Sequence, residues 1–357
     1  MSLSSGSSVL LLHKCTEAIP SALDFPRYPA SWYLLCRSRE IKKRALKKSI
    51  FGRELVLFRG ASGKVIAMDN RCAHLGADLS HGRIDADTIS CPFHGWQYDG
   101  SGRCVRIPTG ATVPPFARQA LYPTEERHGA VFIFNGPEVL FPLPFFFGEE
   151  PDGFVGAPAV EFSAETSWYM VAAHGYDLQH FETVHGRRLV TPLEVDCPAA
   201  FARRSRYRAE ISGATAYDRL LRRFLNRQVT ISITTWGGTL VLITGDFGNV
   251  RSRFLISLLP LEENRTLCAV VVFARRSGSQ LARWLCQPVN LALRKIFTRS
   301  YLVDEAVKLG RPRYLPHHLL EIDRELIDYF RWVAALPQSA TASCNRLGVV
   351  YDRYAEA

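Results

Sequence analysis

The chain contains the stretches Cys72-Ala73-His74-Leu75-Gly76 and Cys91-Pro92-Phe93-His94-Gly95-Trp96, which together read Cys-x-His, sixteen intervening residues, then Cys-x-x-His. Two thiols and two imidazoles therefore fall within 23 residues, a density typical of a metal centre. Each half lies in a short loop beside strand-like sequence, so that two hairpin tips can hold one centre between them. Gly76, Pro92 and Gly95 allow the tight turns that such loops need.

Two kinds of centre use two cysteines and two histidines. One is a tetrahedral structural zinc, and the other is a Rieske [2Fe–2S] cluster, in which one iron carries the cysteines and the other the histidines. Zinc fingers usually group their cysteines and their histidines separately, whereas here each loop supplies one of each. This order favours the iron–sulfur cluster, with zinc and unrelated buried side chains as alternatives. The predicted cluster ligands are Cys72, His74, Cys91 and His94.

The sequence around these loops predicts a small all-β domain. Short β runs between Ser31 and Pro108 alternate with glycine-containing turns such as Asp99-Gly100-Ser101-Gly102. The predicted strands are Trp32–Leu35, Glu54–Phe58, Val65–Met68, Trp96–Tyr98 and Ala130–Phe134. The Pro- and Phe-rich stretch Pro137–Pro158 is irregular and suits a crossover. We therefore expect an N-terminal segment at residues 1–30, the β domain at 31–137 and a second domain at 138–357.

The second half of the chain predicts an antiparallel sheet with helices, and hence an α+β fold. Several strand-like runs follow one another without a helix between each pair. These runs are Ser167–Ala172, Val229–Thr235, Thr239–Thr244, Arg253–Leu259 and Thr266–Phe273. Ser279–Lys308 predicts a helix whose apolar residues, four apart, form a face that packs on the sheet; its arginines leave a membrane-surface helix as an alternative. Leu319–Leu336 predicts a C-terminal helix.

The densest group of metal-binding residues in this half is His174 to His185, which holds three histidines and an aspartate. Asp177 and His180 are three residues apart and share a helix face, whereas His185 lies about 140° further round an ideal helix. Both histidines can ligate one ion only if the helix ends or bulges between them. Two histidines and one carboxylate leave open positions on a metal for O₂ and substrate, as in non-heme Fe(II) oxygenases.

Taken together, the two motifs resemble those of the Rieske non-heme iron oxygenases, and the resemblance extends from about Trp32 to Val333. It implies a helix-grip catalytic domain that holds mononuclear Fe(II). The implied iron ligands are His180, His185 and a late aspartate matched by Asp323, with Glu321 and Asp328 as rivals. The resemblance also implies that Asp177 bridges a cluster histidine of one subunit to an iron ligand of the next, within a homotrimer.

Within that family the resemblance is nearest to the aminopyrrolnitrin oxygenases, which oxidise an arylamine to a nitro group. The similar stretches are Ala30-Ser31-Trp32-Tyr33, Phe51-Gly52-Arg53, Ala73-His74-Leu75-Gly76-Ala77, Tyr176-Asp177-x-Gln179-His180 and Val184-His185. The chain departs from the family at Ala173-His174, where most members carry Glu-Asn. His174 is therefore a candidate hydrogen-bond donor to a ligand, a further ligand or a substrate contact.

Composition bounds the partners and the compartment. The 357 residues include nine dispersed cysteines, and this odd number indicates a reducing compartment. The sequence predicts neither a membrane span nor a signal peptide, so we expect a cytoplasmic protein. The net charge of +10 suits anionic partners. We expect ferredoxin and/or an NAD(P)H-dependent reductase, O₂ and a small aromatic or secondary-metabolite-like substrate, and no nucleic acid. The alternatives are a zinc-containing nucleic-acid-binding protein and a Rieske electron carrier with an inactive second domain.

Overall fold

The chain divides into two compact units in the computed structural model, which describes residues 18–339. One unit is Trp32–Leu140. The other combines Phe141–Gln338 with the residues before Trp32. Each unit has its own sheets and its own core.

The first unit is an all-β domain, as the sequence predicts, and all of its strand pairs are antiparallel. It has three small sheets, with strand orders β1-β11-β10, β2-β3-β4-β9 and β5-β6-β7-β8. The strands are β1 (Trp32–Arg37), β2 (Leu46–Ile50), β3 (Arg53–Arg59), β4 (Val65–Asp69), β5 (Arg83–Asp85), β6 (Thr88–Ser90), β7 (Gln97–Tyr98), β8 (Cys104–Arg106), β9 (Leu121–Tyr122), β10 (Thr124–Arg127) and β11 (Ala130–Phe134).

The core of this unit anchors the two cysteine-containing loops. The first loop follows β4 and the second connects β6 to β7. Phe58 and Met68, from the central sheet, and Tyr98, from β7, are fully buried in one cluster with both loop cysteines. The loops therefore extend from a packed scaffold, which limits their freedom to move.

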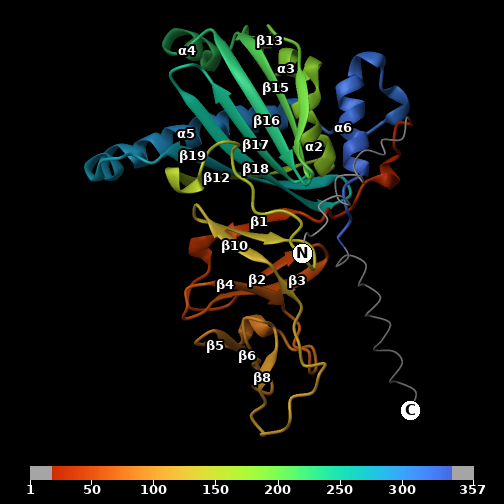
Figure 1. Cartoon of the computed structure of the whole chain (residues 1–357), viewed down its shortest axis with the longest axis vertical. Coiled ribbons are helices and arrows are strands. Elements are labelled where there is room, and N and C mark those ends of the chain that lie inside the picture. The colour runs from red at the N-terminus through yellow and green to blue at the C-terminus, as the bar shows by residue number, and fades with distance from the viewer. Residues whose placement is uncertain (1–17, 340–357) are drawn as a thin grey trace, which may run out of the picture. The chain divides into compact units, whose positions relative to one another are not determined.

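The second unit is built on an eight-stranded antiparallel sheet, which confirms the predicted α+β class. The strand order is β12-β19-β18-β17-β16-β15-β13, and β14 also pairs with β15. Figure 1 shows these strands as one continuous sheet. The strands are β12 (Phe154–Ala164), β13 (Arg187–Leu189), β14 (Glu194–Ala199), β15 (Ala202–Ile211), β16 (Gln228–Trp236), β17 (Leu240–Asp246), β18 (Arg251–Glu262) and β19 (Arg265–Arg275).

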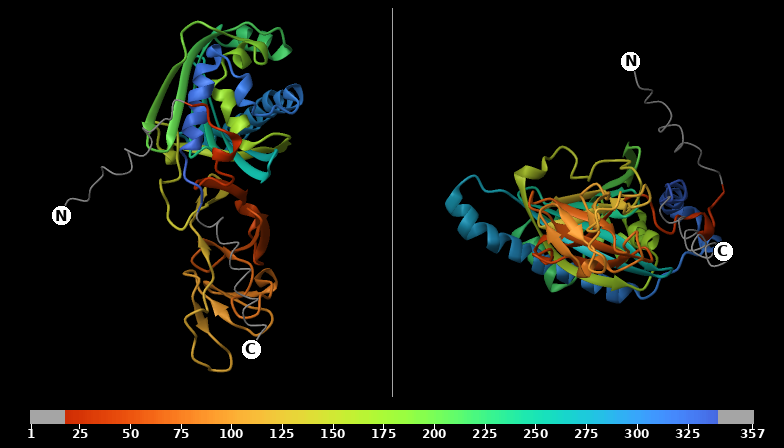
Figure 2. Two further views of the ribbon diagram at one scale, coloured as in Figure 1. Left: turned by 90° about the vertical axis from the view of Figure 1, so that its right-hand side faces the viewer. Right: turned by 90° about the horizontal axis from the view of Figure 1, so that it is seen from below.

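Helices cover this sheet and complete the core. They are α2 (Trp168–Ala173), α3 (Leu178–Thr183), α4 (Ala216–Phe224), α5 (Gln280–Leu309) and α6 (Arg324–Ala334). Buried side chains of α2 and α6, including Trp168, Tyr329 and Trp332, form one cluster with side chains of the sheet. Figure 2 shows the sheet bending around this helical layer. Phe25, from the segment before β1, stacks on Phe330 at 5.9 Å and so joins the same core.

The structure differs from two of the expected elements. Ser167–Ala172 is not a strand, because Trp168–Ala173 form α2. Its Trp, Tyr, Met and Val residues have strand-like composition, but Trp168 and Ala172, four apart, are buried on one helix face, and this packing overrides local propensity. The C-terminal helix begins only at Arg324, after the short 3₁₀ turn Glu321–Asp323.

Helix α5 packs on the sheet, as predicted, but not through the apolar face that the sequence indicates. The helix contacts β12 and β19, and Figure 1 shows it along that end of the sheet. Its apolar residues nevertheless remain exposed, including Leu285 (51 %), Val289 (59 %) and Leu293 (50 %). Several of them line the open side of a cavity instead. In the described part of the chain, no helix is both long and apolar enough to span a bilayer.

The turn between β16 and β17 provides a test of packing in the second unit. Gly238 has φ of +79°, and an added Cβ would lie 2.6 Å from the Trp168 ring and 2.9 Å from Leu336 Cδ1. We expect Gly238→Ala to lower the free energy of unfolding by about 2–4 kcal/mol, since it combines left-handed strain with overpacking. Urea unfolding measures this loss. Gly278→Ala is the control, because nothing lies within 4 Å of its added Cβ; an equal loss in both variants would contradict the argument.

Two candidate metal centres

The two cysteine-containing loops of the first unit have the same backbone structure. In the first loop the Cys72 N–H donates to the Ala77 carbonyl at 2.9 Å, and the Gly76 N–H donates to the Cys72 carbonyl at 2.8 Å. The second loop repeats both bonds, from the Cys91 N–H to the Trp96 carbonyl at 2.8 Å and from the Gly95 N–H to the Cys91 carbonyl at 3.0 Å. Both glycines are left-handed, with φ of 70° and 71°. The loops are thus two copies of one ligand-presenting turn.

These loops bring the four predicted ligands together in pairs. The His74 and His94 rings have centroids 4.8 Å apart, and His74 also stacks on the Trp96 indole at 4.4 Å. Cys72 and Cys91 share one buried cluster. Burial raises the pKa of the Cys72 thiol, and the neighbouring Cys91 sulfur raises it further. A metal bound between the two sulfurs would reverse this effect, because coordination deprotonates a thiol.

The residues present fit a [2Fe–2S] group. Within the described residues, the Nδ1 atom of His74 is buried and has no hydrogen-bond partner. An imidazole nitrogen buried in this way is costly unless it binds something, and a metal ion satisfies its lone pair. Apolar side chains beside the histidines are open to solvent, because Leu75 and Phe93 of the loops and Phe116, whose ring lies 6.4 Å from that of Trp96, are each about two-thirds exposed.

The second candidate centre lies where α3 ends. His180 is buried in α3, the helix stops at Thr183, and His185 follows after the turn. The two Nε2 atoms lie 3.0 Å apart, and the rings are nearly perpendicular at 86°. The helix does therefore end between the two histidines, as joint ligation requires.

The separation of these nitrogens suits a shared metal ion. Two metal–nitrogen bonds of roughly 2.1 Å that meet near a right angle place their nitrogens about 3.0 Å apart. The histidine pair therefore already has the spacing that two ligands of one octahedral ion adopt, and it could hold such an ion with little rearrangement.

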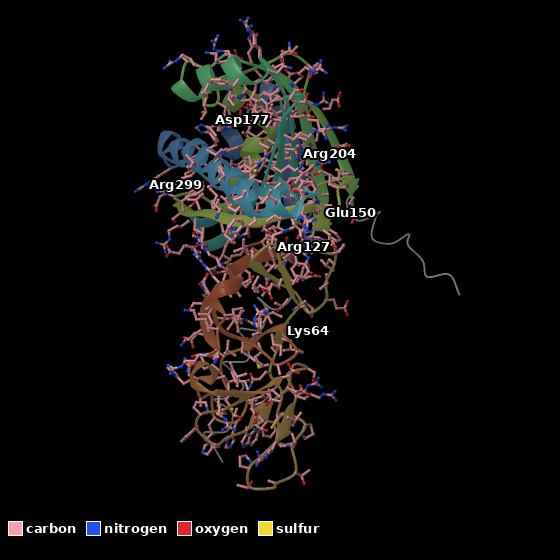
Figure 3. The ribbon with its side chains drawn as sticks, turned by 90° about the vertical axis from the view of Figure 1, so that its left-hand side faces the viewer. Lys64, Arg127, Glu150, Asp177, Arg204 and Arg299 are labelled. Carbon is pink, nitrogen blue, oxygen red and sulfur yellow. The ribbon has the colours of Figure 1, made fainter. Side chains whose placement is uncertain are left out.

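Asp177 lies at the start of α3 rather than within it. Its Oδ1 atom accepts the His180 N–H at 3.0 Å, so the three-residue spacing is that of an N-cap and the third helical residue. Asp177 therefore lies next to His180, as the spacing predicts, but as the residue that precedes the helix and not as part of it. The side chain is half-buried, and Figure 3 labels it within the second unit. The carboxylate fixes the start of the helix that carries His180.

The structure does not place Asp323 beside the histidine pair. Its Oδ2 accepts the Leu320 N–H at 2.9 Å, and its Oδ1 accepts a bond from the Gln179 amide at 3.3 Å. Of its rivals, Asp328 pairs with Arg331 at 2.8 Å. Among the described residues, no three His, Cys, Asp or Glu side chains converge as a complete ligand set. The carboxylate ligand therefore stays a prediction.

Sequence reasoning missed a buried ion pair that holds the His185 turn. Arg187 Nη1 donates to the carbonyls of His185 and Gly186, at 2.7 and 3.1 Å, and to Asp218 Oδ1 at 2.8 Å. Both charged side chains are only 5 % exposed. Arg187 follows the histidine motif directly, but Asp218 lies 31 residues away at the start of α4, and no spacing signal connects them.

The histidines open onto a large apolar cavity of about 810 Å³ within the second unit. His174, His180 and His185 line it, and the His174 ring stacks on His180 at 4.5 Å. Most of the remaining wall is Val, Ile, Leu and Phe, largely from β16, β17, β18, α4 and α5. A cavity of this volume suits a drug-sized organic molecule. His174 therefore lies where it can contact both a ligand histidine and a substrate.

Comparison with known proteins gives these features a context. The family model described as the Rieske [2Fe-2S] domain matches residues 31–117. An aminopyrrolnitrin oxygenase from Pseudomonas fluorescens is 40 % identical over 168 residues, which are 44 % of this chain and 46 % of that protein. The oxygenase component of a 3-ketosteroid-9-alpha-monooxygenase from Rhodococcus rhodochrous is 35 % identical over 143 residues, 40 % of this chain and 35 % of that protein. The matched stretches thus span less than half the length of these relatives.

The fold of most of the chain is also shared with a solved oxygenase. Dicamba monooxygenase with non-heme iron and dicamba superimposes with a TM-score of 0.59 and 20 % sequence identity. The superposition covers 85 % of this chain and 95 % of that one. The two-unit architecture is therefore an established fold.

The Arg187–Asp218 pair predicts a pH-dependent contribution to stability. Burial raises the pKa of Asp218, but bonds from Thr215 and Arg187 outweigh it and hold that pKa below its ordinary value of 3.8. We expect Asp218→Asn to lower the free energy of unfolding at pH 7 by roughly 3 kcal/mol, since it leaves Arg187 buried without a counter-charge. A folded-state pKa below the unfolded one means that this stabilisation is complete above about pH 5 and is lost as Asp218 protonates below pH 4.

Urea unfolding of wild type and variant between pH 3 and 7 measures the difference. Glu210→Gln is the matched control, because the neighbouring Arg188–Glu210 pair is 61 % and 38 % exposed and surface pairs contribute at most about 1 kcal/mol. An effect of Asp218→Asn no larger than that of the control would contradict the assignment.

Proposed function

We propose that the chain is the terminal oxygenase of a Rieske non-heme iron system, because residues 31–117 match the Rieske [2Fe-2S] domain and the chain shares its fold with dicamba monooxygenase. It uses O₂ and externally supplied electrons to oxidise a small organic substrate. The reaction subtypes open to it are hydroxylation, N-oxygenation, demethylation and oxidative cyclisation.

One observation carries this proposal: the Nε2 atoms of His180 and His185 lie 3.0 Å apart on the wall of an apolar cavity of about 810 Å³. A ligand pair of this kind gives a metal access to substrate, whereas a structural metal site is closed. The apolar wall binds an organic substrate and keeps water from the reacting atoms. The relatives named for aminopyrrolnitrin and ketosteroids support an aromatic or polycyclic substrate.

Different residues of the chain are proposed to hold the two metal centres and to position their ligands. Cys72, His74, Cys91 and His94 hold the [2Fe–2S] cluster, and His180 and His185, with a carboxylate proposed to be Asp323, hold the iron. When bound, these groups supply single electrons and an open coordination position for O₂. Asp177 fixes the start of α3, and Arg187 fixes the carbonyl end of the His185 turn. Both keep the imidazoles in the spacing that the iron needs.

The electron donor is a ferredoxin and/or an NAD(P)H-dependent reductase. Leu75, Phe93 and Phe116 form an exposed apolar surface beside the cluster loops, on which such a protein can dock. A nucleic-acid partner is disfavoured, because nearby carboxylates partly neutralise the basic clusters of the surface. Arg204 and Arg206, for example, both form ion pairs with Asp196. None of the seven described cysteines forms a disulfide, which supports a cytoplasmic location.

A second candidate function follows from the position of Asp323, which caps a turn instead of facing the histidines. The chain could then be a Rieske electron carrier whose second unit binds no iron. The number of irons per chain separates the two functions, because the carrier holds two and the oxygenase holds three.

Metal analysis of variants tests the proposal. Cys72→Ser is expected to abolish the visible absorption of the cluster, whereas His180→Ala is expected to keep it and to lose about one iron per chain. Asp323→Ala is expected to behave like His180→Ala, with Asp328→Ala as the control on α6. A colourless wild-type protein that binds zinc would contradict the assignment of the iron–sulfur cluster. A coloured protein with two irons per chain would contradict the oxygenase function and support the electron carrier.

The proposed function also predicts a role for Asp177 in assembly and electron transfer. We propose that the chain is a homotrimer in which Asp177 joins an iron ligand of its own subunit to His74 or His94 of a neighbour. Asp177→Asn then keeps both metals but slows reoxidation of the reduced cluster by roughly 10–100-fold, because the hydrogen-bonded bridge is altered. Single-turnover absorption measures the rate, and light scattering measures the oligomer. Glu182→Gln, an exposed charge on the same helix, is the control; wild-type rates in Asp177→Asn or a competent monomer would refute the bridge.

A further inference from the structure

Not every charged side chain that lines the cavity has a partner of opposite charge. There are four in the described part of the wall, namely Glu165, Arg187, Arg253 and Arg294. Three of them have an opposite charge nearby. Arg187 pairs with Asp218 at 2.8 Å, Arg253 binds Glu149 through two nitrogens, and Glu165 lies 3.9 Å from Arg311.

Arg294, on α5, is the exception. Its Nε donates to Asn290 Oδ1 at 2.7 Å, and its Nη1 donates to the Arg251 carbonyl at 3.0 Å. Both acceptors are neutral, and no carboxylate among the described side chains forms an ion pair with Arg294. The guanidinium remains charged at neutral pH because arginine does not deprotonate in proteins.

The surroundings increase the need for a negative charge. Glu149 already serves two cations, since Arg275 lies 3.5 Å from the same oxygen that Arg253 uses. Burial lowers the pKa of Arg294, and the nearby Arg253 lowers it further. Arg253 and Arg275 therefore share the one carboxylate of Glu149, and, among the described side chains, Arg294 is left without one in an otherwise apolar wall. Arg294 is half-buried, so water solvates its charge only in part, and a bound anion would compensate it.

We propose that Arg294 is the anchor for a negatively charged group of the substrate, so that the cavity selects organic anions with an apolar body and a carboxylate or similar oxyanion. A guanidinium recognises such groups with two parallel hydrogen bonds, and the apolar walls accommodate the body. The His180–His185 pair lines the same cavity, so anchoring one end orients the other. The choice of substrate class rests on the proposed function, whereas the binding site itself does not.

Two fluorescent probes with the same pyrene and alkyl chain test the anchor: 1-pyrenebutyrate, which ends in a carboxylate, and 1-pyrenebutanol, which ends in a neutral hydroxyl. Equilibrium dialysis against the purified full chain at pH 7.5 and about 0.3 M NaCl measures both dissociation constants, and the salt screens attraction to the basic surface. We expect wild type to bind the carboxylate at least about tenfold more tightly than the alcohol. Arg294→Gln reduces this ratio to within about twofold and leaves the affinity for the alcohol unchanged. Arg294→Lys retains part of the preference.

Arg299→Gln is the matched control, since it removes one exposed arginine from the same helix, where Figure 3 labels it, and that residue does not line the cavity. It is expected to keep the wild-type ratio. The proposal is overturned if wild type shows no preference for the carboxylate, if Arg294→Gln keeps the preference, if Arg299→Gln loses it equally, or if Arg294→Gln also loses the alcohol. Dialysis measures binding and not turnover, so it tests the anchor separately from the oxygenase function. If the protein lacks the third iron but still prefers the carboxylate, the oxygenase function is overturned and the anchor is supported.

Discussion

The end of helix α3 at Thr183 is the constraint on which the second unit depends. If the helix continued, His180 and His185 would point about 140° apart, and no ion could bind both. Because the chain leaves the helix there, the two imidazoles meet with 3.0 Å between their Nε2 atoms. Two groups on either side preserve this break: Asp177 caps the start of the helix, and Arg187 binds the carbonyls of the turn after it. The buried Asp218 in turn neutralises Arg187, so the site reaches from α3 to α4.

Much of this arrangement could be predicted from the sequence, because it depends on short-range patterns. The cluster loops are identified by residue type and spacing alone, and the need for a helix break follows from the four residues between His180 and His185. The α+β class and the strands β16–β19 follow from strand-like runs without intervening helices. The helix α2 could not be predicted, because its strand-like residues are overruled by packing that involves distant parts of the chain.

The remaining misses have the same physical origin. Asp218 forms an ion pair with Arg187, which is 31 residues away in the sequence, so no local sequence pattern predicts the pair. The apolar stripe of α5 was interpreted as a buried face, yet side chains such as Val289 line the open side of a cavity. Periodicity indicates that one face of a helix is apolar and does not say what fills the space beside it. Arg294 looks ordinary in the sequence as well. Only the structure shows that, among the described side chains, its hydrogen-bond acceptors are neutral and none is a carboxylate.

The matching turns around Cys72 and Cys91 have a consequence for the speed of electron transfer. Each turn is closed by two hydrogen bonds of its own backbone and by a left-handed glycine, so its shape is set by the protein itself. The His74 ring is further immobilised against the Trp96 indole. A centre gripped in this way has little room to change its bond lengths and angles when its charge changes. The reorganisation energy of a cluster bound there would therefore be small, which would favour fast electron transfer.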